Sequence, residues 1–163
     1  MGPTPSRQHL FLLLITLGAG FLDTPPTDAA CQTEEVVKVT VVVVLATDQC
    51  NKIDPLLKCL AEEVRKKRPN LTGFQQGPQI CKSLTVGKED TFELLEDQSA
   101  LVTVKHGANA KNWVCLKVKT PGVGDITYAS LCGKFFPVVT EYKTKKQETL
   151  ILAIRVEPCK GKK

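Results

Sequence analysis

The chain has 163 residues, of which 42% are hydrophobic and 24% are charged, and its formal net charge is +5. The length suits a single domain with a hydrophobic core of its own, and the ordinary composition excludes an intrinsically disordered chain. A moderately basic surface favours acidic partners, although an excess of lysine also serves solubility alone.

Residues 1–30 have the pattern of a secretory signal peptide. Arg7 precedes a largely apolar run at residues 10–22, and two alanines close the segment immediately before Cys31. Its removal takes away one Arg and two Asp and leaves 21 basic and 15 acidic residues, a net charge of +6. No later apolar run reaches the ~18–20 residues of a membrane helix. We therefore expect a secreted or periplasmic protein with no transmembrane helix after signal cleavage.

The start of the mature chain has a second interpretation. Residues 28–31 (DAAC) resemble in part the cleavage box of bacterial lipoproteins, which would place a lipid anchor on Cys31. Asp28 argues against this anchor, because such boxes carry an aliphatic residue at its position. A flexible leader at residues 31–35 then leads into a single domain at 36–159, and a basic tail follows at 160–163.

The first two predicted elements are a strand and a helix. Residues 36–46 are rich in valine, and apolar residues on both faces indicate a strand in the centre of a sheet. Asp54 can cap a helix that begins with Pro55, and the helix is predicted over residues 54–68, before Pro69. Its apolar stripe at helical spacing consists of Leu56, Leu57, Leu60, Ala61 and Val64.

Beyond the helix, short β-like segments alternate with turn signals. The predicted strands are residues 71–75, 80–86, 91–95, 101–105, 113–119, 126–131, 135–142 and 150–156. Pro137 lacks a donor for a β-ladder, so its strand is expected at an edge or a bulge. The predicted fold class is α+β, with one amphipathic helix packed on a mostly antiparallel β-sheet or sandwich.

Six cysteines beyond the leader are disulfide candidates, because the thiols of an exported protein meet an oxidising compartment. They are Cys50, Cys59, Cys81, Cys115, Cys132 and Cys159. The pair Cys132–Cys159 is favoured among fifteen connectivities, because both residues lie just past the ends of late strands. Cys59 has alternative partners in Cys50, Cys81 and Cys115. The sequence therefore predicts a disulfide-stapled domain with at most one free thiol.

The sequence indicates neither a catalytic site nor a metal site. His106 is the sole histidine after the signal, no C-x-x-C or G-x-S-x-G motif occurs, and no nucleophile has an identifiable base. Glycine-rich phosphate loops and aromatic residues interleaved with basic clusters are also absent, so we expect no cofactor and no nucleic-acid partner. The alternative is a thiol-dependent enzyme or redox protein that uses Cys132, whose thiolate the nearby Lys134 would favour.

The most distinctive candidate surface is the segment at residues 133–137 (GKFFP). Its candidate binding residues are Lys134, Phe135 and Phe136. Adjacent residues on a strand point to opposite faces, so one ring would lie in the core and the other would be exposed. Burial of both rings is the alternative, because large aromatic side chains usually serve cores.

The signal, the scattered cysteines and the segments at residues 54–58 and 133–137 resemble small exported bacterial proteins of unassigned function, over residues 40–159. Cystatin-type inhibitors share the outline of one helix on an antiparallel sheet. However, the Q-x-V-x-G hairpin is missing, and Trp113 follows Asn112 instead of a proline. We expect an exported non-enzymatic binding or envelope-associated module, with an unknown protein or an anionic envelope or polysaccharide partner.

Overall fold

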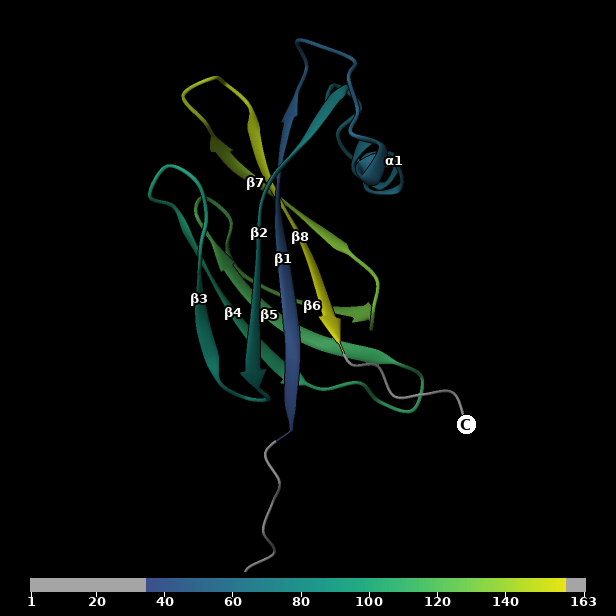
Figure 1. Cartoon of the computed structure of the whole chain (residues 1–163), viewed down its shortest axis with the longest axis vertical. Helices are drawn as coiled ribbons and strands as arrows, with labels where there is room; N and C mark the ends of the chain where they lie inside the picture. Colours follow the sequence, from purple (N-terminus) through teal and green to yellow (C-terminus); the bar gives the residue numbers. More distant parts are fainter. Residues whose placement is uncertain (1–34, 158–163) are drawn as a thin grey trace, which may run out of the picture. The chain divides into compact units, whose positions relative to one another are not determined.

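The computed structural model describes residues 35–157, which belong to one compact unit of the chain. The predictions for the signal peptide, for Cys31 and Cys159 and for the basic tail fall outside these residues. Figure 1 shows the elements. In chain order they are β1 (Val36–Thr47), the 3-10 turn η1 (Pro55–Leu57), α1 (Lys58–Arg65), β2 (Gly73–Thr85), β3 (Glu89–Glu93), β4 (Ser99–His106), β5 (Trp113–Thr120), β6 (Gly124–Leu131), β7 (Phe136–Lys143) and β8 (Thr149–Glu157).

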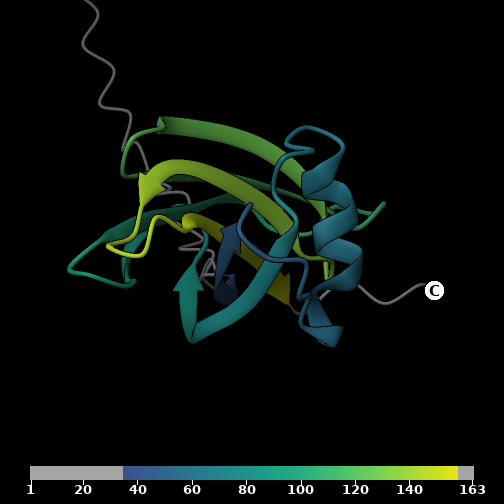
Figure 2. The ribbon, with the colours of Figure 1, turned by 90° about the horizontal axis from the view of Figure 1, so that it is seen from above.

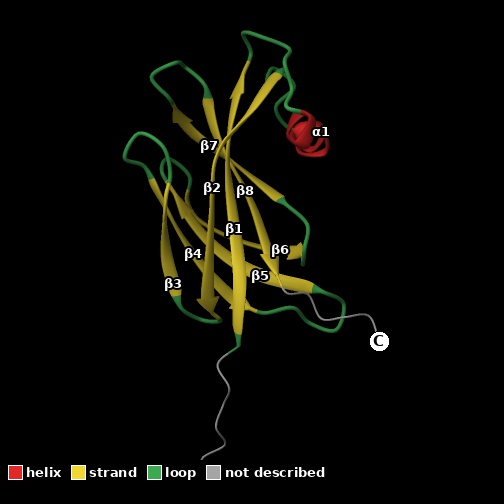
Figure 3. Ribbon diagram, in the orientation of Figure 1, coloured by secondary structure: helices red, strands yellow, loops and turns green. Residues whose placement is uncertain are grey.

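The strands of the described residues form two four-stranded sheets (Figure 3). The first sheet has the strand order β2-β1-β8-β7, and the second sheet has the order β3-β4-β5-β6. Neighbouring strands are antiparallel in both sheets. The predicted α+β class, mostly antiparallel β with a single helix, is therefore confirmed. Pro137 lies in β7, an edge strand, as predicted.

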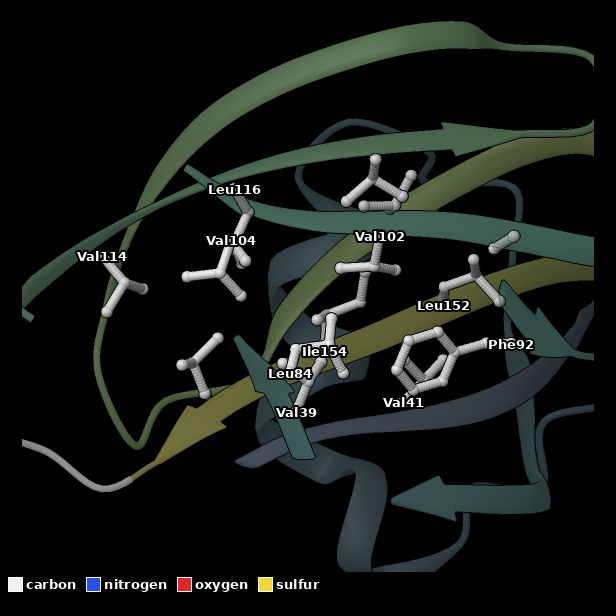
Figure 4. Packing of buried hydrophobic residues seen from close by; sticks show 14 of the residues in the cluster. Val39, Val41, Leu84, Phe92, Val102, Val104, Val114, Leu116, Leu152 and Ile154 are labelled. Carbon is white, nitrogen blue, oxygen red and sulfur yellow. The ribbon is translucent and has the colours of Figure 1, made fainter. Parts of the chain in front are cut away.

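β1 lies in the centre of the first sheet, between β2 and β8, as its valines predict. Successive side chains of a strand point to opposite faces. Val39 and Val41 point between the sheets, where they belong to one buried cluster with Phe92 and Leu116 of the second sheet. Figure 4 shows how residues from both sheets meet in this inner core. The two sheets therefore pack face to face as a sandwich.

The opposite side chains of β1 form a second core with the helical segment. Val42, Val44 and Ala46 are buried on the outer face of the first sheet, and η1 and α1 cover this region (Figure 2). The buried residues of the helical segment are Leu57, Leu60, Ala61 and Val64. Their spacing of three and four residues is that of one helix face.

The start of the helical segment agrees with the prediction. The Asp54 carboxylate accepts a hydrogen bond of 3.1 Å from the backbone N–H of Leu56, and Pro55 is the first residue of η1. The helix end is predicted less well, because α1 ends at Arg65 rather than at Arg68.

β2 replaces two strands that the sequence predicts. The segments at residues 71–75 and 80–86 are joined in one strand that pairs with β1. Pro78 lies between them, close to a register shift of β1 between Val42 and Val44. A bulge of this kind absorbs a residue that cannot join the ladder. The ladder therefore continues past the proline, which an edge strand such as β2 tolerates.

A polar contact joins turns of the two sheets. Glu96, between β3 and β4, accepts hydrogen bonds from the Tyr142 hydroxyl at 2.8 Å and from the backbone N–H of Lys145 at 3.1 Å. Tyr142 belongs to β7, and Lys145 lies in the turn between β7 and β8. The hydrogen bond from Tyr142, followed by that from Lys145, lowers the pKa of the Glu96 carboxyl.

The lowered pKa of Glu96 predicts a contribution to acid stability. The ionised carboxylate stabilises the fold above the pKa of an unfolded glutamate, about 4.3, and this contribution is lost as the pH falls through the folded-state pKa. We expect the urea midpoint, followed by circular dichroism, to fall less for Glu96→Gln than for the wild type between about pH 6 and about pH 3. Part of the fall persists, because the pKa values of Asp90 and Asp125 are also lowered, by Lys82 and Lys117. Equal falls in the two proteins would contradict the prediction.

A buried hydroxyl lies at the border of the inner core. The ring of Tyr128 in β6 stacks on that of Phe136, with centroids 3.9 Å apart and an interplanar angle of 16°. The Tyr128 hydroxyl is buried, and it has no hydrogen-bond partner within residues 35–157. Burial raises the pKa of this hydroxyl, because the charged phenolate is poorly solvated there.

Removal of this hydroxyl is expected to stabilise the protein. Tyr128→Phe keeps the stacked ring and removes a buried group without a partner, so the free energy of unfolding should rise by about 1 kcal/mol. Differential scanning calorimetry would then show a Tm higher by about 3 °C. Tyr142→Phe is the matched control: it removes the hydrogen bond to Glu96 and should lower the Tm. A lower Tm for Tyr128→Phe than for the wild type would contradict the absence of a hydrogen-bond partner for this hydroxyl.

Candidate binding groove

An open apolar groove lies between the helical segment and the outer face of the first sheet. It has a volume of about 230 Å³ and is lined by Val42, Leu56, Leu57, Leu60, Gln76, Gln79, Phe135 and Ala153. A second hollow of about 240 Å³ shares three of these residues and is lined by Leu56, Cys59, Leu60, Glu63, Gly133, Lys134 and Phe135. The two hollows are therefore adjacent, and together they are named the helix groove.

Leu56 lies at the rim of the helix groove and is 82% exposed. The sequence places it in the buried stripe of the helix, and this prediction is wrong. Residues 55–57 form a 3-10 turn, which has about 3.0 residues per turn instead of about 3.6. Leu56 lies outside the face that Leu57 and Leu60 bury. A large apolar side chain is thereby left available at the groove.

The turn before β7 forms the wall of the groove opposite the helix. Gly133 has φ +78°, a conformation that side chains other than glycine rarely adopt, and Lys134 N–H donates to the Leu131 carbonyl at 3.2 Å. Lys134 Nζ then lies 3.1 Å from Glu63 Oε1 of α1. This ion pair contributes little to stability because it is exposed, but it ties the turn to the helix.

The two adjacent phenylalanines lie on different sides of the first sheet. Phe135 packs against the core under the helix and lines the helix groove. Phe136 packs against the inner core, where it stacks on Tyr128. Of the three candidate binding residues, the structure therefore brings Lys134 and Phe135 together at the groove and places the Phe136 ring in the sandwich.

A polar row continues from the apolar floor of the groove along the same face. The register of the first sheet places Cys81 of β2, Thr40 of β1 and Arg155 of β8 next to one another. Each residue of this row lies two positions along its strand from a groove residue, as Thr40 does from Val42 and Arg155 from Ala153. The outer face therefore changes from apolar to polar and basic within one step of the pleat.

A larger hollow, of about 410 Å³, is lined in part by Pro55. Its lining is mixed and includes Phe74 as well as Lys52, Asp54 and Glu148. This hollow lacks the exposed Leu56, so we take the helix groove as the candidate site.

Four cysteines expected in disulfides carry free thiols in the structure. They are Cys50, Cys59, Cys81 and Cys115. The predicted pairs among them and the limit of one free thiol are therefore wrong. Cys81 lies on the outer face of the first sheet and Cys115 on the outer face of the second. Stacked sheets are about 10 Å apart, whereas bridged Cα atoms lie within about 7 Å, so these two residues cannot pair across the sandwich.

Cys132 differs from these four cysteines. It is disulfide-bonded, and none of the other described cysteines is its partner. Cys132 Sγ lies 3.1 Å from the carbonyl oxygen of Val156 in β8. Cys159, the predicted partner, lies outside the described residues, so the pair Cys132–Cys159 stays a prediction. A sulfur atom in a disulfide is not a thiolate nucleophile, and the alternative of a Cys132-dependent enzyme gains no support from it.

Other catalytic groups are not assembled in the part of the chain that the structure describes. His106 stands opposite Cys115 in the register of β4 and β5, but no hydrogen bond joins their side chains within that part. There, too, no three His, Cys, Asp or Glu side chains are grouped closely enough to hold a metal ion. Among residues 35–157, no helix has the length and apolar character needed to cross a membrane.

Comparisons of the chain with models of protein families, with curated proteins and with solved structures find no match. The class of the protein therefore follows from its own fold and groove. It is an antiparallel β-sandwich that carries one short helix on an outer face and an apolar groove beside that helix.

Sequence reasoning finds part of the groove and misses the rest. Lys134 and Phe135 are identified because two aromatic residues follow a turn with a basic residue. Val42, Ala153 and Arg155 are missed, because no sequence pattern shows how much of a sheet face a helix covers. The valine and alanine look like ordinary strand residues, and only the register with β2 and β7 reveals their place.

Cys81 is expected to be the most reactive of the exposed thiols. The hydrogen bond with Thr40 is the main cause of a lowered pKa of Cys81, and Gln79, Lys38 and Arg155 act in the same direction. The reactive thiolate is therefore present at lower pH than in an ordinary cysteine. We expect iodoacetamide at about pH 7 to modify Cys81 severalfold faster than Cys59, as measured by peptide mass spectrometry.

Thr40→Val is the matched variant for this experiment, because it keeps the shape of the side chain and removes the hydroxyl that lies 3.3 Å from Cys81 Sγ. It should slow the modification of Cys81 and leave that of Cys59 unchanged. Equal rates for the two cysteines in the wild type would refute the assignment.

Proposed function

We propose that the protein is an exported non-enzymatic binding module that holds a segment of a partner protein in the helix groove. The observation that carries this proposal is Leu56, which is 82% exposed beside a groove with an apolar floor. Exposed apolar surface of this kind is typical of interaction sites. The export of the protein rests on the signal pattern of residues 1–30.

The open shape of the helix groove favours a protein segment over an enclosed small molecule. Its two hollows measure about 230 and 240 Å³ and are open to solvent. Sites for small molecules usually bury most of the surface of the ligand. An open groove instead suits one or two apolar side chains that project from a larger partner. The rim is polar, with Gln76, Gln79 and the Lys134–Glu63 ion pair, as in many protein interfaces.

Peptide selection on the purified protein tests this proposal. A phage-displayed library of random dodecapeptides would be selected against the immobilised wild type. We expect the enriched peptides to share a large apolar residue and to bind Leu56→Asp at least about tenfold more weakly, since a central apolar anchor commonly contributes this much. Phe135→Ala should weaken them similarly.

Leu131→Asp supplies the matched control. Leu131 is also a partly exposed leucine, at 42%, but it lies at the end of β6 in the second sheet. The enriched peptides should bind this variant as they bind the wild type. Peptides that bind Leu56→Asp at full strength would rule out the helix groove. Loss of binding only in Trp113→Ala, which removes the exposed indole paired with Leu131, would move the site to the second sheet.

A further inference from the structure

We infer that the segment bound in the helix groove is acidic, and that it places a carboxylate against Arg155 when its apolar side chain enters the groove. This inference rests on the proposed function, since it specifies the partner of the same site. It follows from the position of Arg155, from its unused hydrogen-bonding capacity and from the charges around it.

Arg155 stands directly beside the groove. It follows Ala153, a groove residue, by two positions on β8, so both side chains lie on the outer face. Its Cζ atom lies 4.7 Å from the centroid of the Phe135 ring, which lines the same groove. This cation–π contact holds the guanidinium next to the groove wall.

The guanidinium retains donors that no described residue uses. Arg155 Nε is buried and has no hydrogen-bond partner within residues 35–157. The ion pair with Glu157 is long, at 3.5 Å between Arg155 Nη2 and Glu157 Oε2, and both side chains are partly exposed. A buried N–H without an acceptor lowers the stability of the folded protein. A carboxylate of the partner would pair with the part of the guanidinium that is exposed, and arginine binds carboxylates with two parallel hydrogen bonds.

The charges next to Arg155 also favour an anion. Lys38 lies one row further along the outer face, opposite Glu157 in the register of β1 and β8. Two cations therefore face one carboxylate at this end of the sheet. Lys134, on the groove wall, is already paired with Glu63. Among residues 35–157 Lys38 has no ion pair, so the excess of positive charge beside the groove lies at its Arg155 end.

The distance between the apolar floor of the groove and Arg155 determines the sequence pattern that we expect in the partner segment. A strand advances about 3.3 Å per residue, so Ala153 and Arg155 are separated by about 6.6 Å along β8. The same spacing separates the side chains of residues i and i+2 in an extended peptide. The partner segment should therefore carry a large apolar residue and an acidic residue two positions apart.

A pair of capped peptides tests this inference. The probes are Ac-Gly-Phe-Thr-Glu-Gly-NH2 and Ac-Gly-Phe-Thr-Gln-Gly-NH2, titrated into ¹⁵N-labelled protein and followed by chemical-shift changes of groove residues. We expect the Glu peptide to bind the wild type about threefold to tenfold more tightly than the Gln peptide, as for a partly exposed charge pair. In Arg155→Gln this preference should vanish, while the affinity for the Gln peptide stays the same.

Lys119→Gln is the control with the same change of charge, on the outer face of the second sheet. It should keep the preference for the Glu peptide. A preference that persists in Arg155→Gln, or is absent from the wild type while both peptides shift the groove resonances, would overturn the inference and leave the groove intact. Failure of both peptides to shift any groove resonance would overturn the proposed function as well.

A second measurement on the wild type avoids any effect of substitution on folding. Raising the salt concentration from about 0.05 to about 0.5 M shortens the range of charge interactions severalfold. The preference for the Glu peptide should shrink accordingly, while the affinity for the Gln peptide should not fall. A preference that does not respond to salt would contradict recognition by Arg155.

Discussion

The burial of both faces of β1 is the constraint on which the other layers depend. Side chains that alternate along this strand belong to two different cores, one between the sheets and one under the helix. Val41 and Val42, for example, are neighbours in the chain and pack against different layers. Where both faces of the strand are covered, side chains must be apolar, which explains the run of valines at residues 41–44, whereas Thr40 and Lys38 occupy the outer face next to this run. Any shift of its register by one residue would exchange the two cores.

The helix groove exists because the helical segment covers only part of the face that β1 presents. η1 contacts β2 and α1 contacts β7, so the segment crosses the strands of the first sheet. A helix is about 10 Å wide, whereas the twelve residues of β1 extend over about 40 Å. The helix therefore shields one end of the outer face. Beside it, Val42 and Ala153 form the floor of the groove, and the row with the buried Thr40 and the partly exposed Arg155 follows.

Local patterns in the sequence predict most of the elements, because their causes are local. The valines of β1, the cap at Asp54 and the proline at the edge in β7 each act within a few residues. The prediction of two separate strands in place of β2 is wrong, because a bulge lets the ladder continue past Pro78. The disulfide predictions fail for a different reason. Pairing of Cys81 or Cys115 depends on which face of which sheet each residue occupies, and spacing along the chain does not contain that information.

The same limit applies to the candidate site. Lys134 and Phe135 stand out in the sequence as a basic residue and an aromatic residue after a glycine turn. Arg155 does not stand out, because its significance comes from Phe135, which is twenty positions away and joins it only through the pairing of β7 with β8. The exposure of Leu56 is likewise not visible in the amphipathic pattern, which groups it with the buried Leu57 and Leu60. Sites assembled from several strands are thus visible only after the register is known.

Pro78 has a consequence for self-association. β2 spans thirteen residues and is an edge strand of its sheet, so its free backbone groups offer a template for pairing with a second copy of the chain. Proline has no backbone N–H to donate, and the register shift beside it interrupts the regular ladder of this strand. Self-association by pairing of β2 with another copy is therefore disfavoured, although β2 is the longest edge strand of the two sheets. The groove on the outer face of the same sheet stays open to a different partner.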